Sequence, residues 1–305
     1  MVNGDPIFGY DVDGSLAVAL GLLEAQAYSL RLAEIDRVIG ERLFADAARR
    51  RGLTIQQLEQ DEVIRNANDV TDADVEQIIR WNTTPGVTLE ELRQETRRAL
   101  EQRRRDERRR AFIDTLRRAA TVRVLLRPSL SHRATLSVGG STLNQRSTTV
   151  HLVEFLDYLC RHCRSFQPVL QDLSRKYGTA LELEIRHFPI TRRSRTVARA
   201  AWCAGQANRF WEYHRQLLTT IPTADLSVLV ALGIDVGLDG AALAQCIASK
   251  RAHEAVERDM SEARRLGVGS TPTLFINGAP FVGLWPADAL TRVIDHEIGA
   301  GQSHD

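Results

Sequence analysis

The sequence predicts an all-α domain followed by an α/β domain, with a linker between them. Over residues 1–127, apolar residues recur at spacings of three and four, which is typical of amphipathic helices. Residues 128–149 are rich in Ser, Thr and Gly, as expected of a linker. From residue 150 the pattern alternates between strand and helix. A chain of 305 residues is long enough for two such domains.

Capping signals mark the helix starts of the first domain. Thr54 and Gln57, and again Thr88 and Glu91, have the spacing of a capping box, and Thr71 precedes a shorter periodic stretch. The helix after Thr88 is long, and its middle is charged on all sides. We expect that middle to be a solvated, ion-paired segment or, as the alternative, a contact for an acidic partner or nucleic acid.

The second domain, residues 150–305, shows a clear order of elements. Within the linker, apolar residues at 134–138 predict a short first strand. Asn277-Gly278 between two apolar runs is a strong signal for a hairpin. The predicted elements are a strand at 150–158, a helix at 164–177, a strand at 181–185, a helical block at about 195–265, a hairpin at 273–284 and a helix at 286–298.

The composition excludes several classes of protein. The 40 basic and 39 acidic residues nearly cancel, so we expect no nucleic-acid partner. We find no uninterrupted apolar run of about 18–20 residues and predict no membrane span. Residues Val2–Pro6 predict a strand and turn rather than a secretory signal. The 4 cysteines allow two pairs but are too few for a disulfide-dense scaffold.

The motif that carries chemistry is Cys160-Arg161-His162-Cys163, at the junction of a predicted strand and helix. A helix N-terminus carries partial positive charge and favours a thiolate. Arg161 and His162 add positive charge or N–H donors within the same turn. Two intervening residues let Cys163 turn back onto Cys160. We therefore expect Cys160 to be the exposed attacking thiol and Cys163 the buried resolving thiol.

The same Cys-x-x-Cys spacing also occurs as half of a zinc site. Structural zinc generally takes four ligands, and no second closely spaced Cys or His pair is present, because Cys203 and Cys246 lie far apart in sequence. We therefore expect no metal site and no soluble cofactor. Capture of copper or zinc by the two motif thiols is kept as an alternative.

A second motif, Gly269-Ser270-Thr271-Pro272-Thr273, precedes the predicted hairpin. Proline cannot donate to a strand ladder, so Pro272 is expected at the start of the strand. An ordinary trans turn proline is the alternative that this motif leaves open when taken by itself.

Together these segments resemble a known family. Val153–Cys163 resembles the active-site segment of DsbA-like thiol–disulfide oxidoreductases of the thioredoxin superfamily, and Gly269–Gly278 resembles their cis-proline loop and following strand. Ala201–Ala204, continuing to Phe210–His214, resembles the start of their helical insertion. The resemblance extends over about residues 134–298. It implies a thioredoxin-like fold with a helical insertion, and thiol–disulfide exchange with protein substrates.

The resemblance also implies roles for single residues. Pro272 corresponds to the cis-proline beside the dithiol, and Thr271 to the residue that offers backbone hydrogen bonds to an extended substrate. Glu154 matches a buried acid that relays a proton to or from Cys163, although a solvated carboxylate at a strand end is the alternative. Arg161 stands where many relatives have proline, which leaves the redox poise open.

The remaining cysteines bear on location. Some secreted relatives join cysteines at the positions of Cys203 and Cys246 as a structural disulfide, whereas two free buried thiols are the alternative. A bridge implies an oxidising compartment. We therefore expect an extracytoplasmic protein, of the periplasm or cell envelope, whose native signal or anchor is missing from this sequence.

The first domain resembles, in short segments, the N-terminal helical region of SurA-type periplasmic chaperones. This implies binding of unfolded clients or self-association as a homodimer, with a simple packing appendage as the alternative. No parvulin domain follows, so prolyl isomerase activity is not implied. The matching segments are Val2–Ile7, Ile35–Ile39, Ala47–Leu53, Val70–Val75 and Phe112–Arg123.

The leading hypothesis is disulfide formation in unfolded or partly folded protein clients. Such an enzyme needs a membrane or soluble redox partner that resets the dithiol. A disulfide isomerase or reductase is the alternative within the same chemistry. A chaperone-type holdase in which the dithiol is secondary is the alternative from a different class.

Overall fold

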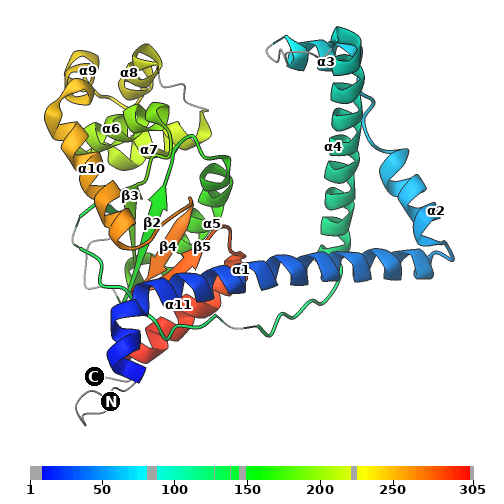
Figure 1. Cartoon of the computed structure of the whole chain (residues 1–305), viewed down its shortest axis with the longest axis horizontal. Helices are drawn as coiled ribbons and strands as arrows, with labels where there is room; N and C mark the ends of the chain where they lie inside the picture. The colour runs from blue at the N-terminus through cyan, green and yellow to red at the C-terminus, as the bar shows by residue number, and fades with distance from the viewer. Residues whose placement is uncertain are drawn as a thin grey trace. The chain divides into compact units, whose positions relative to one another are not determined.

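The computed structural model describes residues 9–80, 88–126, 128–137, 139–143, 149–220 and 225–302 (Figure 1). The predicted strand and turn at Val2–Pro6 lies outside this range. The chain divides into two compact units, one formed by residues 1–31 with 127–305 and the other by residues 32–126.

Residues 32–126 form a helical unit. Its helix starts carry capping boxes at Thr54, Thr71 and Thr88, each with the side chain accepting from a backbone N–H three residues later. Phe44 and Phe112 meet edge to face in its core, with ring centroids 5.7 Å apart. The elements are the later part of α1 (Gly9–Arg50), α2 (Ile55–Glu59), the π-helical turn η1 (Gln60–Ile64), α3 (Asp72–Ile79) and α4 (Leu89–Arg118).

The charged middle of α4 is laced with ion pairs. Arg103 pairs with Glu107 one turn later. Other arginines of this stretch reach acidic side chains on neighbouring elements: Arg109 with Glu59, Arg108 with Glu62 and Arg104 with Asp74. These pairs tie α4 to the end of α2, to η1 and to α3.

The first half of α1 belongs to the other unit, which departs from the predicted domain boundary at residue 127. Tyr28 stacks on Trp285 with ring centroids 4.5 Å apart. The Ser29 hydroxyl donates to the Val282 carbonyl at 2.7 Å. Contacts with Val282 and Trp285, which lie far from α1 in the sequence, therefore place the first half of α1 in the same unit as the sheet.

By length and composition, α1 is also apolar enough to cross a membrane, with a mean hydropathy of 1.2 over 18 residues. The prediction of no membrane span rested on a count of uninterrupted apolar residues, and an average over a window of residues singles out α1 where that count does not. Leu23 and Leu30 on this helix are exposed, whereas Ala25 and Tyr28 are buried.

The second unit is built on a five-stranded mixed sheet in the order β1-β3-β2-β4-β5. β2 and β3 run parallel, and the other neighbouring pairs are antiparallel. In the β4–β5 turn, Asn277 and Gly278 adopt φ of 45° and 83°, as a type I′ hairpin requires. The strands are β1 (Ser141–Leu143), β2 (Val150–Leu156), β3 (Leu181–His187), β4 (Thr273–Ile276) and β5 (Ala279–Val282).

The predicted strand at 134–138 is wrong over residues 134–137, and β1 lies a few residues later. The Ala134 N–H donates to the Gly278 carbonyl at 2.8 Å, and the Ser137 N–H donates to the Glu262 carboxylate at 2.7 Å. Such isolated bonds hold an extended connection but do not make a ladder. Val138 lies outside the described residues.

Helices cover both faces of the sheet, and α6–α10 form the insertion (Figure 1). Because side chains alternate along a strand, Val153 and Phe155 of β2 pack with Ala263 and Leu266 around α10. Glu154, between them, points to the opposite face, toward α5. The helices are α5 (Arg161–Tyr177), the 3₁₀ turn η2 (Gly178–Ala180), α6 (Arg192–Gln206), α7 (Phe210–Thr219), α8 (Leu226–Asp235), α9 (Gly240–Ala248), α10 (Lys250–Arg265) and α11 (Ala287–Gln302).

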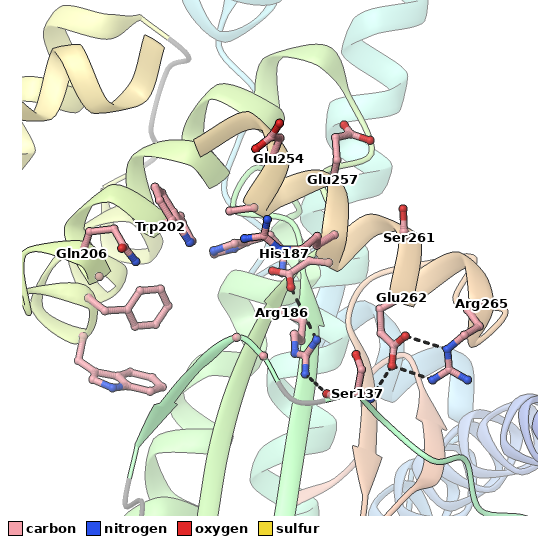
Figure 2. A pocket seen from close by; sticks show the side chains of 18 of the residues that line it. Ser137, Arg186, His187, Trp202, Gln206, Glu254, Glu257, Ser261, Glu262 and Arg265 are labelled. Atoms are coloured by element: carbon pink, nitrogen blue, oxygen red, sulfur yellow. Dashed lines mark hydrogen bonds and ion pairs between the residues drawn. The ribbon is translucent and has the colours of Figure 1, made fainter. Parts of the chain in front are cut away.

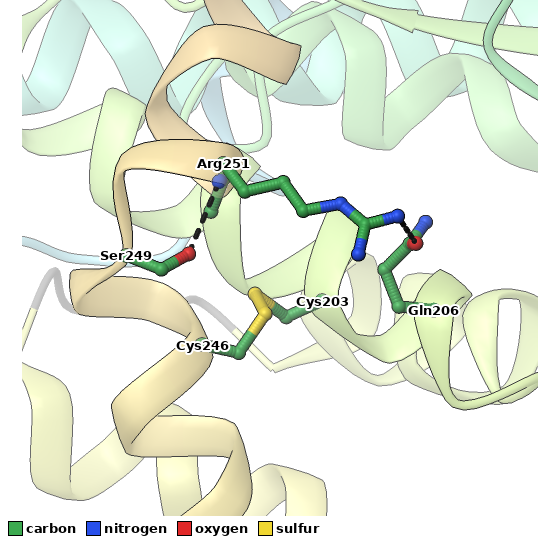
Figure 3. The surroundings of a disulfide bond; sticks show 6 residues. Cys203, Gln206, Cys246, Ser249 and Arg251 are labelled. Atoms are coloured by element: carbon green, nitrogen blue, oxygen red, sulfur yellow. Dashed lines mark hydrogen bonds between the residues drawn. A yellow bond between two sulfur atoms is a disulfide. The ribbon is translucent and has the colours of Figure 1, made fainter.

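A disulfide between Cys203 of α6 and Cys246 of α9 closes a 43-residue separation within the insertion (Figure 3). Beside it, the Arg251 guanidinium donates to the Gln206 side chain at 3.4 Å. The bridge and this bond tie α6 to the consecutive helices α9 and α10, which follow it at a distance in the sequence.

We expect the Cys203→Ser/Cys246→Ser double variant to lose roughly 4 kcal/mol of unfolding free energy, because a cross-link over such a loop restricts the unfolded chain. Urea denaturation followed by tryptophan fluorescence measures the loss. Equal unfolding midpoints for the two proteins without reductant would contradict the expectation.

Candidate functional site

The Cys160–Cys163 dithiol lies where β2 passes into α5. Cys160 is the N-cap residue of α5, with φ of −72° and ψ of 120°, and its N–H donates to the Asp157 carbonyl at 3.0 Å. The Asp157 carboxylate accepts from the N–H groups of Leu159 and Ile190, both at 2.8 Å. Asp157 therefore fixes the turn that presents the first cysteine.

The two cysteines differ in accessibility as the sequence led us to expect. Cys160 is partly exposed, whereas Cys163 is fully buried, and both are free thiols. Arg161 and His162 are exposed on the first turn of α5. An incoming sulfur therefore has access to Cys160 before Cys163.

The loop before β4 meets the dithiol. The Thr271–Pro272 peptide bond is cis. The Cys160 thiol donates to the Thr271 carbonyl, with 3.5 Å between sulfur and oxygen. Two segments separated by more than 100 residues thus meet at one surface, and the backbone of Thr271 lies beside the accessible sulfur.

Glu154 lies within the protein, not at a solvated strand end. Its side chain is completely buried, between the strand neighbours Ile185 and Leu274. Burial raises the pKa of this carboxyl to about 8, while the Gln167 amide, which donates to Oε2 at 3.0 Å, acts in the opposite direction. The second oxygen, Oε1, is buried and has no hydrogen-bond partner.

The pKa of the Cys163 thiol is raised by burial first and by the charge of Glu154 second. The resolving sulfur therefore needs a proton acceptor before it becomes a nucleophile. Glu154 is a carboxyl close enough to act on it electrostatically, and its own pKa lies near neutrality.

Three residues of this site were missed by sequence reasoning. Gln167 and His214 join through His214 Nε2 and Gln167 Oε1 at 3.3 Å, and Tyr158 Oη lies 3.0 Å from His214 Nδ1. All three are buried. Gln167 could have been found, since it follows Cys163 by four residues and so shares its helix face. His214 could not, because only the fold brings α7 to the dithiol.

A cavity of about 1170 Å³ lies beside β3, α6, α7 and α10 (Figure 2). Arg186, His187 and Trp202 are among its lining residues, and neither Cys160 nor Thr271 is. Its size does not make it the site of the thiol chemistry, because no reactive sulfur faces it. The partly exposed Cys160 instead lies outside the lining of this cavity.

The other predicted site residues are also accounted for. Cys203 and Cys246 are bridged to each other within the insertion. Among the residues that the structure describes, no group of three or more His, Cys, Asp or Glu side chains is arranged to hold a metal ion.

The comparison with known proteins assigns the α/β unit to a family. Residues 139–296 match the family model described as Thioredoxin. Among curated proteins, the chain is 32% identical over 150 residues to the Na(+)/H(+) antiporter NhaA 1 of Mycobacterium sp. strain KMS, covering 47% of this chain and 24% of the relative. It is 28% identical over 144 residues to NhaA of Herminiimonas arsenicoxydans, covering 47% and 23%. The chain thus spans about a quarter of the length of these relatives.

Among solved structures, oxidised BdbD from Bacillus subtilis superposes with a TM-score of 0.50 at 19% identity, covering 55% of this chain and 97% of that one. Wolbachia pipientis alpha-DsbA1 superposes with a TM-score of 0.50 at 22% identity, covering 59% and 97%. These likenesses show a shared fold. Through residues 139–296, just over half of its length, the chain belongs to the thioredoxin family and has the fold of the DsbA-type proteins.

Proposed function

We propose that this protein is a thiol–disulfide oxidoreductase that forms disulfides in unfolded or partly folded protein clients. One observation carries the proposal: the accessible Cys160 sulfur lies 3.5 Å from the backbone carbonyl of Thr271, with Cys163 buried behind it in the same helix turn. An accessible attacking sulfur, a buried resolving sulfur and an adjacent backbone edge are the parts that exchange with an extended polypeptide needs.

The oxidising reaction is a sequence of two exchanges. A client thiolate attacks the Cys160 sulfur of the Cys160–Cys163 disulfide, forming a client–Cys160 disulfide and expelling Cys163 as a thiolate. A second client thiolate then attacks the client sulfur of that mixed disulfide, forming the client disulfide and expelling Cys160 as a thiolate. The two electrons from the client now reside in the dithiol, and a membrane or soluble partner disulfide must remove them.

Glu154 handles the proton of the resolving sulfur. When Cys163 leaves as a thiolate, the protonated carboxyl gives it a proton, and when Cys163 must attack, the carboxylate takes the proton back. A pKa of about 8 leaves both forms of Glu154 accessible near neutral pH. Burial is the main cause, because it disfavours the charged forms of Glu154 and Cys163 and so raises the pKa of both groups.

Thr271 and Pro272 form the substrate edge. When Cys160 is oxidised it no longer has a thiol proton to donate, so the Thr271 carbonyl is free to accept from a client backbone N–H. An extended client segment would then run beside the dithiol as an added strand. Backbone recognition of this kind depends little on the client's side chains and suits an enzyme with many clients.

The insertion disulfide supports an oxidising, extracytoplasmic setting for this activity. The helical unit of residues 32–126 would bind clients or join two copies of the chain, so that clients are held near the dithiol. Both roles are proposals.

The reduction potential of the Cys160–Cys163 pair tests the direction of the reaction. We expect a value between about −120 and −180 mV, the range from DsbA to protein disulfide isomerase. Equilibration with glutathione buffers, read by mass spectrometry of alkylated thiols, gives this value. A potential near that of thioredoxin, about −270 mV, would contradict the oxidising direction and favour a reductase.

We expect Cys163→Ala to accumulate a mixed disulfide when a client peptide is offered as its own disulfide: the Cys160 thiolate attacks one peptide sulfur and expels the other peptide as a thiolate, and no resolving sulfur remains to release the adduct. Cys160→Ala, the matched control, should form no such adduct at the buried Cys163. Intact-mass spectrometry under non-reducing conditions detects the adduct. Equal adduct formation by the two variants would show that the assignment of attacker and resolver is wrong.

We expect Glu154→Gln to stabilise the protein at pH 7 by on the order of 3 kcal/mol. Below the pKa of this carboxyl in the unfolded chain, Glu154 is neutral in both states and costs no stability. As the pH rises from there toward the folded-state pKa of about 8, the unfolded chain ionises first and the folded protein progressively loses stability. The difference should therefore vanish near pH 4. Urea denaturation at both pH values measures it, with the exposed Asp235→Asn as the control. A stabilisation that is equal at both pH values would refute the burial argument.

A further inference from the structure

The buried hydrogen-bond chain beneath the dithiol joins three elements. Glu154 comes from β2, Gln167 from α5 and His214 from α7, and Tyr158 follows β2. The contacts in order are Gln167 Nε2 to Glu154 Oε2 at 3.0 Å, His214 Nε2 to Gln167 Oε1 at 3.3 Å, and Tyr158 Oη to His214 Nδ1 at 3.0 Å.

The donor and acceptor roles of these groups fix a single direction for the hydrogen-bond chain. The Gln167 nitrogen donates to Glu154, so its oxygen must accept. That oxygen faces His214 Nε2, which must then carry the proton, and a neutral imidazole leaves Nδ1 as an acceptor. The Tyr158 hydroxyl donates to Nδ1. Each group thereby excludes the reversed orientation of its neighbour.

The surroundings keep His214 neutral and fixed. Burial lowers the pKa of this histidine to about 3, with the charges of His187 and Arg215 acting in the same direction. Phe210 stacks on its ring at 5.4 Å between centroids, and Trp211 meets it edge to face, also at 5.4 Å. The imidazole is therefore held in one plane and is uncharged near neutral pH.

We propose that Gln167 and His214 are positioning residues of the dithiol, which hold the Glu154 carboxyl in place with Oε1 left free for proton exchange with the Cys163 thiol. Cys163 and Gln167 stand four residues apart on the same face of α5, so the carboxyl that Gln167 grips lies under the resolving cysteine. The inference rests on the proposed thiol–disulfide function for its catalytic consequence.

The titratable groups that face Glu154 are few. They are Cys163 on α5, Tyr158 after β2 and His214 on α7, with Cys160 beyond Cys163. The strand neighbours Ile185 of β3 and Leu274 of β4 are apolar. Because His214 stays neutral and the pKa values of Tyr158 and Cys163 are raised, Glu154 is the buried group that changes charge near pH 8.

The resolving step provides the test. In the reaction of reduced protein with oxidised glutathione, Glu154 takes the Cys163 proton. The Cys163 thiolate attacks the Cys160 sulfur of the glutathione adduct, and the glutathione thiolate is expelled. Acid quenching and mass spectrometry give the rate constant for loss of the adduct. In the parent protein, we expect it to rise with pH through an inflection near pH 8.

The variants separate positioning from simple support of the fold. Gln167→Leu and His214→Phe should each move the inflection upward by about one pH unit, because the carboxylate loses or misorients its donor. His214→Gln supplies an amide N–H to Gln167 Oε1 and should restore the parent inflection. Gln171→Leu, which changes an exposed glutamine of the same helix, should leave it unchanged. Glu154→Gln should abolish it.

Two outcomes would overturn the proposal: equal shifts for His214→Phe and His214→Gln, or no shift for Gln167→Leu. Should His214→Phe fail to fold, Gln167→Leu carries the same test. The ¹³C shift of the Glu154 carboxyl, titrated by NMR in the reduced protein, needs no client and should show the same upward displacement. A displaced carboxyl titration in a protein that oxidises no client would uphold the hydrogen-bond chain and refute the proposed function.

Discussion

The burial of one carboxyl is the constraint on which the site depends. Glu154 occupies a strand position that would ordinarily hold an aliphatic side chain, and its neighbours across the sheet are Ile185 and Leu274. Burying a carboxyl costs free energy unless it is neutral or hydrogen-bonded. The protein partly meets that cost with the Gln167 amide and leaves one oxygen without a partner. Such unmet polar atoms are tolerated where they serve chemistry.

The geometry around the dithiol follows from this arrangement. α5 must begin immediately above the carboxyl for Cys163 to reach it, and the side chain and backbone of Asp157 fix the turn that begins the helix. The loop ending at Pro272 then meets the exposed end of the same turn. The buried Cys163 thus lies near the Glu154 carboxyl and the partly exposed Cys160 beside the Thr271 backbone, and the proposed function assigns the two halves of an exchange reaction to these separate surroundings.

The insertion contributes more than bulk. Through α7 it supplies His214, whose ring is clamped by Phe210 and Trp211, and through α6 and α9 it carries the disulfide that ties its helices together. A structural disulfide and a redox dithiol therefore coexist in one unit. They differ in accessibility, since the Cys203 sulfur is buried in the insertion whereas the Cys160 sulfur is partly exposed at the surface.

Local features were readable from the sequence because their physics is local. The capping boxes at Thr54 and Thr88, the Asn277-Gly278 turn and the cysteine pair at a strand-to-helix junction each depend on residues within a few positions of one another. The buried acid and the proline loop required a family resemblance, since neither spacing nor composition links Glu154 or Pro272 to the dithiol.

Long-range contacts were decided by the tertiary structure alone. The strand predicted at 134–138 is absent over the described residues 134–137 because a strand exists only where a partner edge is available, and β3 offers that edge to residues 141–143. The early part of α1 joined the sheet unit because Trp285 gave Tyr28 a ring to stack on. Sequence alone determined which cysteines are the candidates for the proposed thiol chemistry, because their spacing and the strand-to-helix junction are local. Packing across α5 and α7 decided which side chains bind the buried Glu154 carboxyl directly and through Gln167, because contacts between distant segments leave no periodic trace in the sequence.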